Sequence, residues 1–282
     1  MKRWIRKALM GVVPEEDLKS IYNSYDIIGD IAVVHLNEHS KKYGQIIAQA
    51  IMKAHHNVKV VLGQISPVHG EFRLRKLEHL AGENRTTTIH RESSCLFAVD
   101  LNKCYFSPRL FYERLRIAKL VGYGEAVLNM FAGVGCFSIV MAKKSDVEKV
   151  YSVDINPDAV RFMQENVRLN SVYGKVVPIE GDAKEVAQGL RQKVDRVLMP
   201  LPEKALDYLS YAVEAIKPEC GWIHYYDFEH AYKGEDPIEK VKCKVRRKLE
   251  SLGAAFNFKS ARIVRSTGPN WYQVVLDIYV SK

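Results

Sequence analysis

Three segments between residues 125 and 182 constrain the fold of this 282-residue chain more than any other part of its sequence. An apolar run ends at Asn129, and the turn Gly133-Val134-Gly135 then opens a helix whose bare backbone can approach a ligand closely. One acid stands at the end of each of the next two apolar runs, Asp154 and Asp182. Because such strand ends lie side by side in a βαβ sheet, the segments predict one site for a nucleotide-like ligand.

Strand and helix patterns alternate from Glu125 to the end of the chain. The predicted strands cover residues 126–129, 149–153, 176–180, 196–199, 221–228, 261–265 and 273–280. Such alternation predicts an α/β domain with a seven-stranded, mostly parallel sheet and helices on both faces. The turn-forming residues 266–270 join the last two strands as a hairpin, so the final strand is expected to run antiparallel.

The chain before residue 111 has a mixed pattern that predicts a small α+β domain. We expect an amphipathic stretch at 15–22, strands at 31–36 and 58–62, a helix at 45–53, and a β-rich stretch over 86–105 that turns near residues 92–94. The predicted parts are an N-terminal extension (1–24), the small domain (25–110) and the α/β domain (111–282).

A linking helix is expected over residues 111–120. Its apolar side chains are expected to face inward and its basic ones solvent; these are Leu115, Ala118 and Leu120 on one side and Arg114, Arg116 and Lys119 on the other.

Charge and cysteine content limit the partners and the compartment. The formal charge of +9 and the pI of about 9.2 favour a polyanionic partner, with nucleic acid first, although a merely basic enzyme remains an alternative. Five widely spaced cysteines without a C-x-x-C pair argue against a zinc site or a disulfide framework and indicate a reducing compartment. The apolar stretch 8–13 is too short for a signal peptide, and no run reaches membrane-spanning length, so we expect a cytoplasmic protein without a membrane partner.

The glycine pattern narrows the choice of ligand. Dinucleotide-binding folds also place an acid after the second strand, so Asp154 alone does not identify the ligand. The sequence Phe131-x-Gly133-x-Gly135 lacks the third glycine that pyrophosphate binding normally needs, and no Gly-x-x-x-x-Gly-Lys-Ser/Thr sequence occurs. A ligand without phosphates fits better, although an ordinary α/β core with a tight turn remains the alternative.

The run resembles motif I of the Rossmann-like S-adenosylmethionine methyltransferases. The resemblance places Asp154 at the ribose and Asp182 at the adenine of that cofactor. It implies that cofactor contacts come from Phe131, Gly133, Gly135, Asp154, Ile155, Asp182, Ala183 and Met199.

A second pattern, upstream of the glycine turn, is more specific. Tyr105-Phe106-Ser107-Pro108-Arg109, followed by Glu113-Arg114 and, about twenty residues on, by the glycine turn, resembles the archaeal and eukaryotic tRNA (guanine-37-N1)-methyltransferases. Further segments in family style are Gly70-Glu71-Phe72-Arg73-x-Arg75, Leu80-Ala81-Gly82-Glu83, Thr88-x-His90-Arg91-Glu92 and Ile223-His224-Tyr225-Tyr226. The resemblance implies methyl transfer to N1 of guanosine 37 by a monomer that binds the tRNA anticodon stem-loop, with residues 25–110 as an RNA-binding domain.

The resemblance also implies roles for single residues. Glu113 takes the position of the general base, and guanine N1 carries a proton at neutral pH that a positioned carboxylate can accept. Arg73 takes the position that holds the base through its carbonyl oxygen, where negative charge builds up. Tyr105 is expected near the cofactor, and Arg109 is expected to order the site. The alternatives are a surface pair of Glu113 with Arg109 and a solvated basic face carrying Arg73 and Arg75.

The chain departs from the family pattern at two loops. Asn129 stands where the family usually has aspartate, so an ion pair of Arg109 at that position is in doubt. Met199-Pro200-Leu201-Pro202 replaces the usual Asn-Leu-Pro, and Pro200 brings neither a side-chain amide nor a backbone N–H. This loop resembles the archaeal branch that also methylates C7 of the wyosine precursor 4-demethylwyosine. A third departure is the N-terminus, where the family's tRNA-elbow domain is expected to be absent or vestigial.

Rival functions remain open at this point. They are the aminocarboxypropyl transferase of wybutosine synthesis, a non-catalytic tRNA-binding protein that kept a cofactor fold, and a small-molecule methyltransferase. Phosphate contacts are expected from basic clusters at 73–76, 114–119 and 240–248, the last of which fits a solvated helix face equally well.

Overall fold

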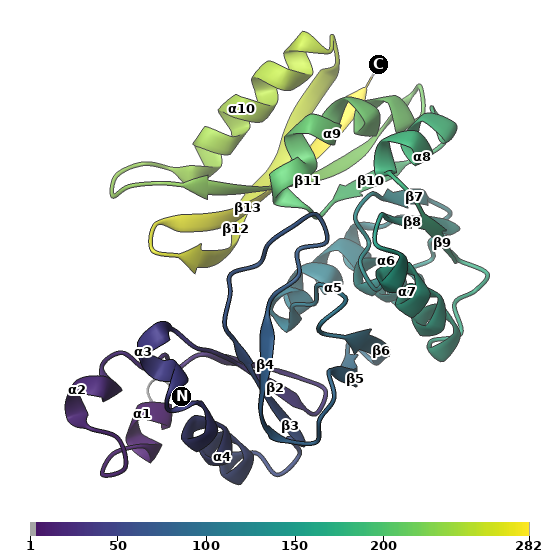
Figure 1. Ribbon diagram of the computed structural model, residues 1–282. Coiled ribbons are helices and arrows are strands. Elements are labelled where there is room, and N and C mark those ends of the chain that lie inside the picture. Colours follow the sequence, from purple (N-terminus) through teal and green to yellow (C-terminus); the bar gives the residue numbers. More distant parts are fainter. Residues whose placement is uncertain (1–3, 282) are drawn as a thin grey trace. The chain divides into compact units, whose positions relative to one another are not determined.

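The computed structural model describes residues 4–281 and divides into two compact units, Met1–Phe111 and Tyr112–Lys282 (Figure 1). The first three residues of the predicted N-terminal extension and the last residue of the predicted α/β domain lie outside the described residues. Among residues 4–281, the helices are all too short or too polar to cross a membrane.

The first unit contains a four-stranded sheet in the order β1-β2-β3-β4. Its strands are β1 (Tyr25–Ile28), β2 (Ile31–His35), β3 (Val60–Gln64) and β4 (Leu77–Gly82). Helix α4 (Gly44–Ala54) connects β2 to β3, which pair in parallel, and packs against β3 and β4. The predicted helix and two of the predicted strands are therefore present, whereas β1 and β4 were not predicted.

Short helices and one hairpin complete this unit: α1 (Trp4–Ala8), α2 (Glu15–Leu18), α3 (Glu38–Lys41), η1 (Pro108–Leu110), β5 (Thr87–Glu92) and β6 (Cys95–Asp100). Ser93 and Ser94 have φ of 52° and 62° in the turn between β5 and β6, which confirms the turn predicted there. Ile5, Leu9 and Ile21 are buried in the same core as α4, so the N-terminal residues pack as part of this unit.

The second unit contains the predicted seven-stranded sheet, in the order β12-β13-β11-β10-β7-β8-β9. Its strands are β7 (Ala126–Asn129), β8 (Lys149–Asp154), β9 (Val176–Glu180), β10 (Arg196–Met199), β11 (Cys220–His230), β12 (Ala255–Gly268) and β13 (Trp271–Ser281). Strand β13 pairs antiparallel with both β11 and β12, whereas β7 to β11 pair in parallel. The predicted fold class is confirmed.

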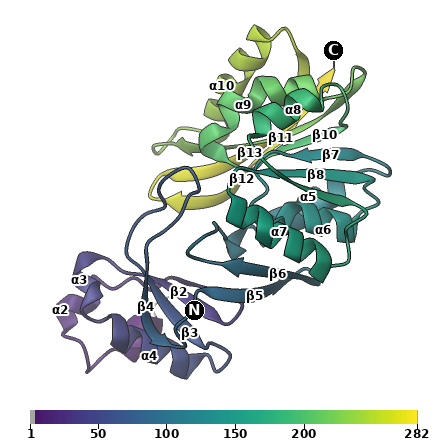
Figure 2. The same ribbon diagram turned by 45° about the vertical axis from the view of Figure 1, so that its right-hand side comes forward.

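Helices cover both faces of this sheet, as Figure 2 shows. One face carries α8 (Ala183–Gly189), α9 (Pro202–Ala215) and α10 (Pro237–Ser251), and the other carries α5 (Phe111–Leu120), α6 (Cys136–Lys144) and α7 (Pro157–Leu169). The orientation predicted for α5 is wrong for Arg114, which is 4% exposed, and for Leu120, which is 43% exposed, whereas Ala118 is buried and Lys119 exposed as predicted. The acid Glu113 lies on the buried side of the same helix.

Candidate active site

The glycine turn lies between β7 and α6, as the sequence predicts. Gly133 and Gly135 have φ of 56° and 91°, in the left-handed region that favours glycine. A Cβ atom on Gly135 would lie 2.9 Å from Cγ of Met163, so the turn packs too closely against α7 for a side chain at this position. The backbone of the turn is therefore fixed by packing as well as by conformation.

Asp154 ties the glycine turn to the end of β8. Its Oδ2 accepts a hydrogen bond from the backbone N–H of Gly133 at 2.6 Å, and its Oδ1 accepts one from the N–H of Asn156 at 3.0 Å. Burial raises the pKa of the Asp154 carboxyl, and the hydrogen bonds from these two N–H groups oppose that shift. A carboxylate has about four lone-pair sites, so Asp154 can still accept from a ligand hydroxyl.

Asp182 begins α8 and is the next acid along the strand ends. Its Oδ1 accepts hydrogen bonds from the N–H of Lys184 at 2.9 Å and from the hydroxyl of Tyr208 at 2.9 Å. Burial favours a higher pKa for the Asp182 carboxyl, but the donors on Lys184 and Tyr208 outweigh it and lower the pKa. The ring of Tyr208 also meets Phe131 edge-on at 5.2 Å between centroids, so one aromatic side chain joins two of the predicted cofactor residues.

The sheet order brings the predicted cofactor segments to one edge. Strands β9, β8, β7 and β10 are consecutive neighbours and parallel, so Asp154, the glycine turn, Asp182 and Met199 all lie at or just after the carboxyl ends of adjacent strands. Ile155 is 43% exposed at this edge, whereas Ala183 and Met199 are buried. Pro202 is buried at the first turn of α9, where its missing N–H leaves no hydrogen bond unmade, and Pro200 is half-buried before it.

Asn129 lies beneath the same edge and is fully buried. Its Nδ2 donates to Oγ of Ser138 at 3.0 Å, and Ser138 also accepts a hydrogen bond from Ser152 at 2.7 Å. The Oδ1 atom of Asn129 has no hydrogen-bond partner among the described residues. The neutral amide is thus held by hydroxyl groups rather than by an ion pair.

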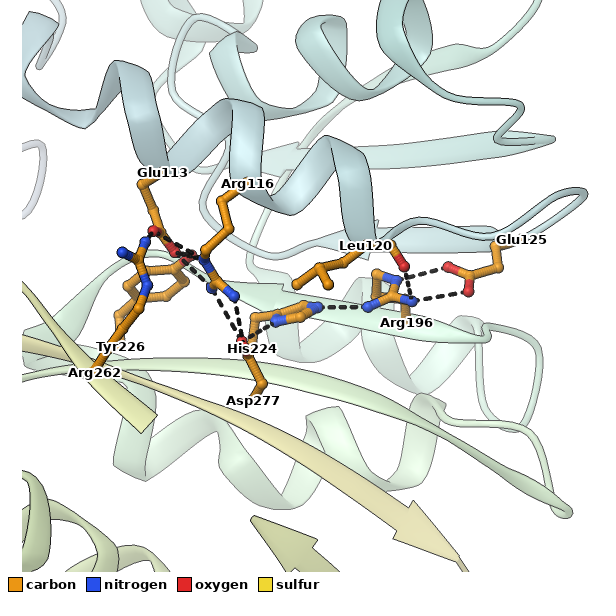
Figure 3. A network of polar contacts seen from close by, with 9 residues as sticks. All are labelled: Glu113, Arg116, Leu120, Glu125, Arg196, His224, Tyr226, Arg262 and Asp277. Atoms are coloured by element: carbon orange, nitrogen blue, oxygen red, sulfur yellow. Dashed lines mark hydrogen bonds and ion pairs between the residues drawn. The ribbon is translucent and has the colours of Figure 1, made fainter. Parts of the chain in front are cut away.

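Glu113 lies in the first turn of α5 and is 2% exposed (Figure 3). Arg116 donates to both of its oxygens, with Nη2 at 2.7 Å from Oε1 and Nε at 3.1 Å from Oε2. The hydroxyl of Tyr226 donates to Oε1 at 2.6 Å, and Arg262 forms a further ion pair with Oε2. Two guanidinium groups and a phenol therefore favour the ionised carboxylate, which is the form that can accept a proton.

The remaining predicted site residues belong to the first unit. The guanidinium of Arg73 lies over the ring of Tyr105 at 4.6 Å, and that of Arg75 lies 5.8 Å from the same ring. Arg75 also donates to the carbonyl of Phe106 at 3.0 Å, and burial lowers the pKa of its guanidinium. The alternative of a solvated basic face is therefore wrong for Arg75, and the aromatic ring of Tyr105 orients both arginines.

The alternative of a surface pair between Arg109 and Glu113 is also wrong. Arg109 donates from Nε to Oδ1 of Asp26 at 2.7 Å, and Glu113 is buried among other partners. Arg109 thus has a carboxylate partner inside the first unit.

Comparison with known families identifies the chain. Residues 88–252 match the TRM5/TYW2 methyltransferase domain, and residues 5–86 match the TYW2 N-terminal domain. The chain belongs to the TRM5/TYW2 methyltransferase family. The family resemblance predicted from the sequence is confirmed.

Three relatives show how the family divides. The tRNA (guanine(37)-N(1))-methyltransferase Trm5b of Pyrococcus abyssi is 41% identical over 95% of this chain and 78% of its own length. The tRNA 4-demethylwyosine(37)-methyltransferase Taw21 of Saccharolobus solfataricus is 38% identical over 93% of this chain and 96% of its own length. The tRNA(Phe) (4-demethylwyosine(37)-C(7)) aminocarboxypropyltransferase of Methanocaldococcus jannaschii is 32% identical over 90% of this chain and 96% of its own length.

Solved structures of family members have the same fold. The crystal structure of Trm5b from P. abyssi matches with a TM-score of 0.86 at 40% identity, covering 96% of this chain and 79% of that one. The crystal structure of TYW2 of M. jannaschii in complex with AdoMet matches with a TM-score of 0.70 at 27% identity, covering 92% of this chain and 100% of that one.

Two of the three predicted phosphate-binding clusters have some of their basic side chains engaged within the protein itself. In the cluster at 114–119, Arg114 is buried and Arg116 pairs with Glu113 and Asp277. On α10, three lysines form ion pairs with nearby acids: Lys240 with Glu229 and Glu235, Lys242 with Glu239, and Lys244 with Asp227 and Glu229. These contacts favour the alternative of a solvated helix face for the α10 cluster.

The sequence analysis missed the partners that hold Glu113. Tyr226 and Arg262 contact it directly, and Asp277 contacts it through Arg116. A signal was present, because Asp277 interrupts the apolar run Val274-Val275-Leu276-Asp277-Ile278, and a charge inside a buried strand requires a partner.

Proposed function

We propose that this chain transfers a methyl group from S-adenosylmethionine to N1 of guanosine 37 in tRNA. The observation that carries the proposal is the 41% identity, over 95% of the chain, to a tRNA (guanine(37)-N(1))-methyltransferase. The buried, ionised setting of Glu113 supports it, because N1 of guanine must lose a proton as the methyl group arrives.

The edge of strands β9, β8, β7 and β10 suits the cofactor. The carboxylate of Asp154 can accept from a ribose hydroxyl while it holds Gly133 and Asn156, and Asp182 can accept from the adenine amino group beside Phe131 and Ala183. Further contacts are assigned to Gly135, Ile155 and Met199, and the bound cofactor supplies an electrophilic methyl group on its sulfonium. All these residues come from one unit and lie at or after the carboxyl ends of its parallel strands, where ligands bind in such sheets.

Three further groups are assigned to the target base. Arg73 is assigned to the guanine carbonyl oxygen, where a guanidinium stabilises the negative charge that builds up on deprotonation. The loop of Pro200 and Pro202 offers shape and carbonyl acceptors to the base. Tyr105 is assigned to order Arg73, whose guanidinium lies over its ring, and Arg109, which pairs with Asp26, is assigned to order the site.

A second activity, C7 methylation of 4-demethylwyosine at the same position, has its own support. Pro200 removes an amide that reads a polar base edge, so the loop is less selective for guanine. The 38% identity to Taw21, a tRNA 4-demethylwyosine(37)-methyltransferase, covers 93% of this chain. Methyl transfer remains the reaction in both activities.

The partner is tRNA, bound at the anticodon stem-loop by a cytoplasmic monomer. The charge of +9 favours tRNA binding through phosphate contacts, which weaken as salt rises. An anticodon loop also lowers the cost of turning the base out toward the methyl group.

The experiment is mass spectrometry of nucleosides from position 37 after reaction with two substrates. Unmodified tRNA is expected to yield 1-methylguanosine, and tRNA carrying 4-demethylwyosine to yield its C7-methylated product. Cofactor labelled separately on the methyl and carboxyl carbons distinguishes methyl from aminocarboxypropyl transfer. Label from the carboxyl carbon in the product, or full activity on tRNA with adenosine at position 37, refutes the proposal.

Glu113→Gln tests the assignment of the base. The variant keeps the shape of the side chain but cannot accept the proton, so we expect the methylation rate to fall about 100-fold or more with tRNA affinity little changed. Equal losses in rate and in affinity would contradict the assignment.

A further inference from the structure

Besides Tyr226, two buried strands carry polar side chains toward the helix that bears Glu113. His224 on β11 and Asp277 on β13 are direct cross-strand partners, and both are nearly inaccessible to solvent. Nδ1 of His224 lies 2.6 Å from Oδ1 of Asp277. Neither residue belongs to the cofactor edge described above, so their burial calls for a different explanation.

The hydrogen-bond directions in this cluster allow one arrangement. Nε2 of His224 lies 2.6 Å from Nη1 of Arg196, and a guanidinium can only donate, so Nε2 must accept. The single proton of the neutral imidazole then sits on Nδ1 and is donated to Asp277 (Figure 3). Arg196 is itself fixed by two hydrogen bonds to Glu125, at 2.6 and 2.8 Å.

Arg116 connects Asp277 to Glu113. Arg116 donates to Asp277 from Nη1 at 2.5 Å and from Nη2 at 3.0 Å. The same guanidinium donates to both oxygens of Glu113. Two residues, Asp277 and Arg116, therefore lie between the imidazole of His224 and the carboxylate assigned as the base.

The charges of the cluster balance only when His224 is neutral. Three guanidinium groups face three carboxylates: Arg116, Arg196 and Arg262 with Glu113, Glu125 and Asp277. A second proton on His224 would add a buried charge and point an N–H at the N–H of Arg196. Burial accordingly lowers the pKa of His224 to about 4.

We propose that His224 and Asp277 are positioning residues for methyl transfer, which hold Arg116 so that its guanidinium fixes the orientation and the ionised state of Glu113. The inference rests on the proposed function, in which Glu113 is the base. Of the groups that contact Glu113, Arg116 is the one that depends on Asp277, because its side chain is partly exposed and Asp277 anchors it to the sheet. Without that anchor, the Glu113 carboxylate keeps Tyr226 and Arg262 but loses a fixed donor pair.

Two substitutions at one position separate this role from a structural one. The amide of His224→Asn reaches the place of Nδ1, so it keeps the donor to Asp277 and loses the acceptor for Arg196. The amide of His224→Gln reaches the place of Nε2, so it keeps the acceptor and loses the donor. Each variant leaves one hydrogen bond unmade, so a merely structural role predicts similar losses of stability and of rate in both.

Single-turnover methylation rates and their pH dependence are the readout. We expect His224→Gln to lower the rate by at least about tenfold, the effect of losing one hydrogen bond to a charged group, with the KM for tRNA unchanged. The acid limb of the pH–rate profile of His224→Gln is expected to move to higher pH. A loosened Arg116 stabilises the ionised carboxylate of Glu113 less, so this carboxylate takes up its proton at a higher pH. The single-turnover methylation rate of His224→Asn is expected to stay within about threefold of the wild-type rate, with the same dependence on pH.

Glu125→Gln is the matched control, because it disturbs the cluster at the end away from Glu113. It is expected to lower thermal stability and leave the acid limb in place. An equal shift of the acid limb in Glu125→Gln and His224→Gln, or equal rates in the two His224 variants, overturns the inference. Glu113→Gln is measured in parallel: if it retains activity, the proposed base is wrong, whereas its loss beside an active His224→Gln overturns only the positioning role.

A measurement on the wild-type protein keeps the inference testable if the variants do not fold. Nitrogen-15 correlation spectra of the histidine rings report which ring nitrogen carries the proton. We expect His224 to be neutral, with its proton on Nδ1, from pH 5.5 to 8. A proton on Nε2, or titration within that range, contradicts the arrangement.

Discussion

Arg196→Met is expected to lower the unfolding temperature of the second unit by roughly 6–20 °C. Arg196 is 2% exposed and donates four hydrogen bonds to three partners: two to Glu125, one to the carbonyl of Leu120 at 2.7 Å and one to His224. Methionine fills much of the volume but makes none of these hydrogen bonds. The substitution therefore leaves a carboxylate, a carbonyl and an imidazole nitrogen without their donor.

The size of the effect follows from the burial of the pair. Removing one partner of a buried ion pair costs about 3–5 kcal/mol, because the other charge stays behind without compensation. For a unit of this size, each kcal/mol lowers the midpoint by roughly 2–4 °C. Differential scanning calorimetry at pH 7 measures the midpoint directly.

Arg161→Met is the matched control. Arg161 pairs with Asp158 at 3.2 Å across one helical turn and is mostly exposed, so the same substitution is expected to cost about 0–1 kcal/mol. A drop for Arg196→Met no larger than that of Arg161→Met would refute the reasoning, since it would mean that the buried contacts contribute no more than a surface pair.

Three further predictions concern the cofactor edge and the buried histidine. Asp154→Asn removes the charge that accepts from Gly133, so S-adenosylmethionine affinity, measured by calorimetry, is expected to fall about 10–100-fold. Gly135→Ala forces a Cβ against Met163 at φ 91° and is expected to cost about 1–3 kcal/mol in urea unfolding. Since the pKa of His224 is lowered to about 4, its neutral form contributes stability above pH 6.5 that is lost as the pH falls toward 4. Wild type is therefore expected to lose roughly 3 kcal/mol more than His224→Asn between pH 7 and pH 4; parallel losses contradict this.

The cofactor edge was predictable because its signals are local in sequence. A buried parallel strand produces a short apolar run, and the residue that follows it lies at the carboxyl edge. Strands β7, β9 and β10 accordingly have the predicted bounds. The long hairpin of β12 and β13 extends beyond the prediction, because β12 alternates exposed and half-buried residues and shows no apolar run over most of its length.

The surroundings of Glu113 were not predictable because its partners are distant in sequence. Arg116 meets Asp277 across 161 positions and His224 meets Asp277 across 53. Helical periodicity assigns Arg116 to solvent, and only the tertiary structure supplies the carboxylate that makes its half-buried position stable. The same limit explains why Arg109 was considered as a partner for Glu113 rather than for Asp26.

Asn129 shows how one departure from the family pattern fits its surroundings. The residue is fully buried, and its contacts are the hydroxyls of Ser138 and, through it, Ser152. A carboxylate in that setting would be a buried charge beside the neutral hydroxyls of Ser138 and Ser152, at a cost of several kcal/mol. Arg109 has its own carboxylate partner in Asp26, so it does not depend on an acid at position 129. The Oδ1 of Asn129, which has no hydrogen-bond partner among the described residues, is an uncharged acceptor at a position where an aspartate would bring a charge.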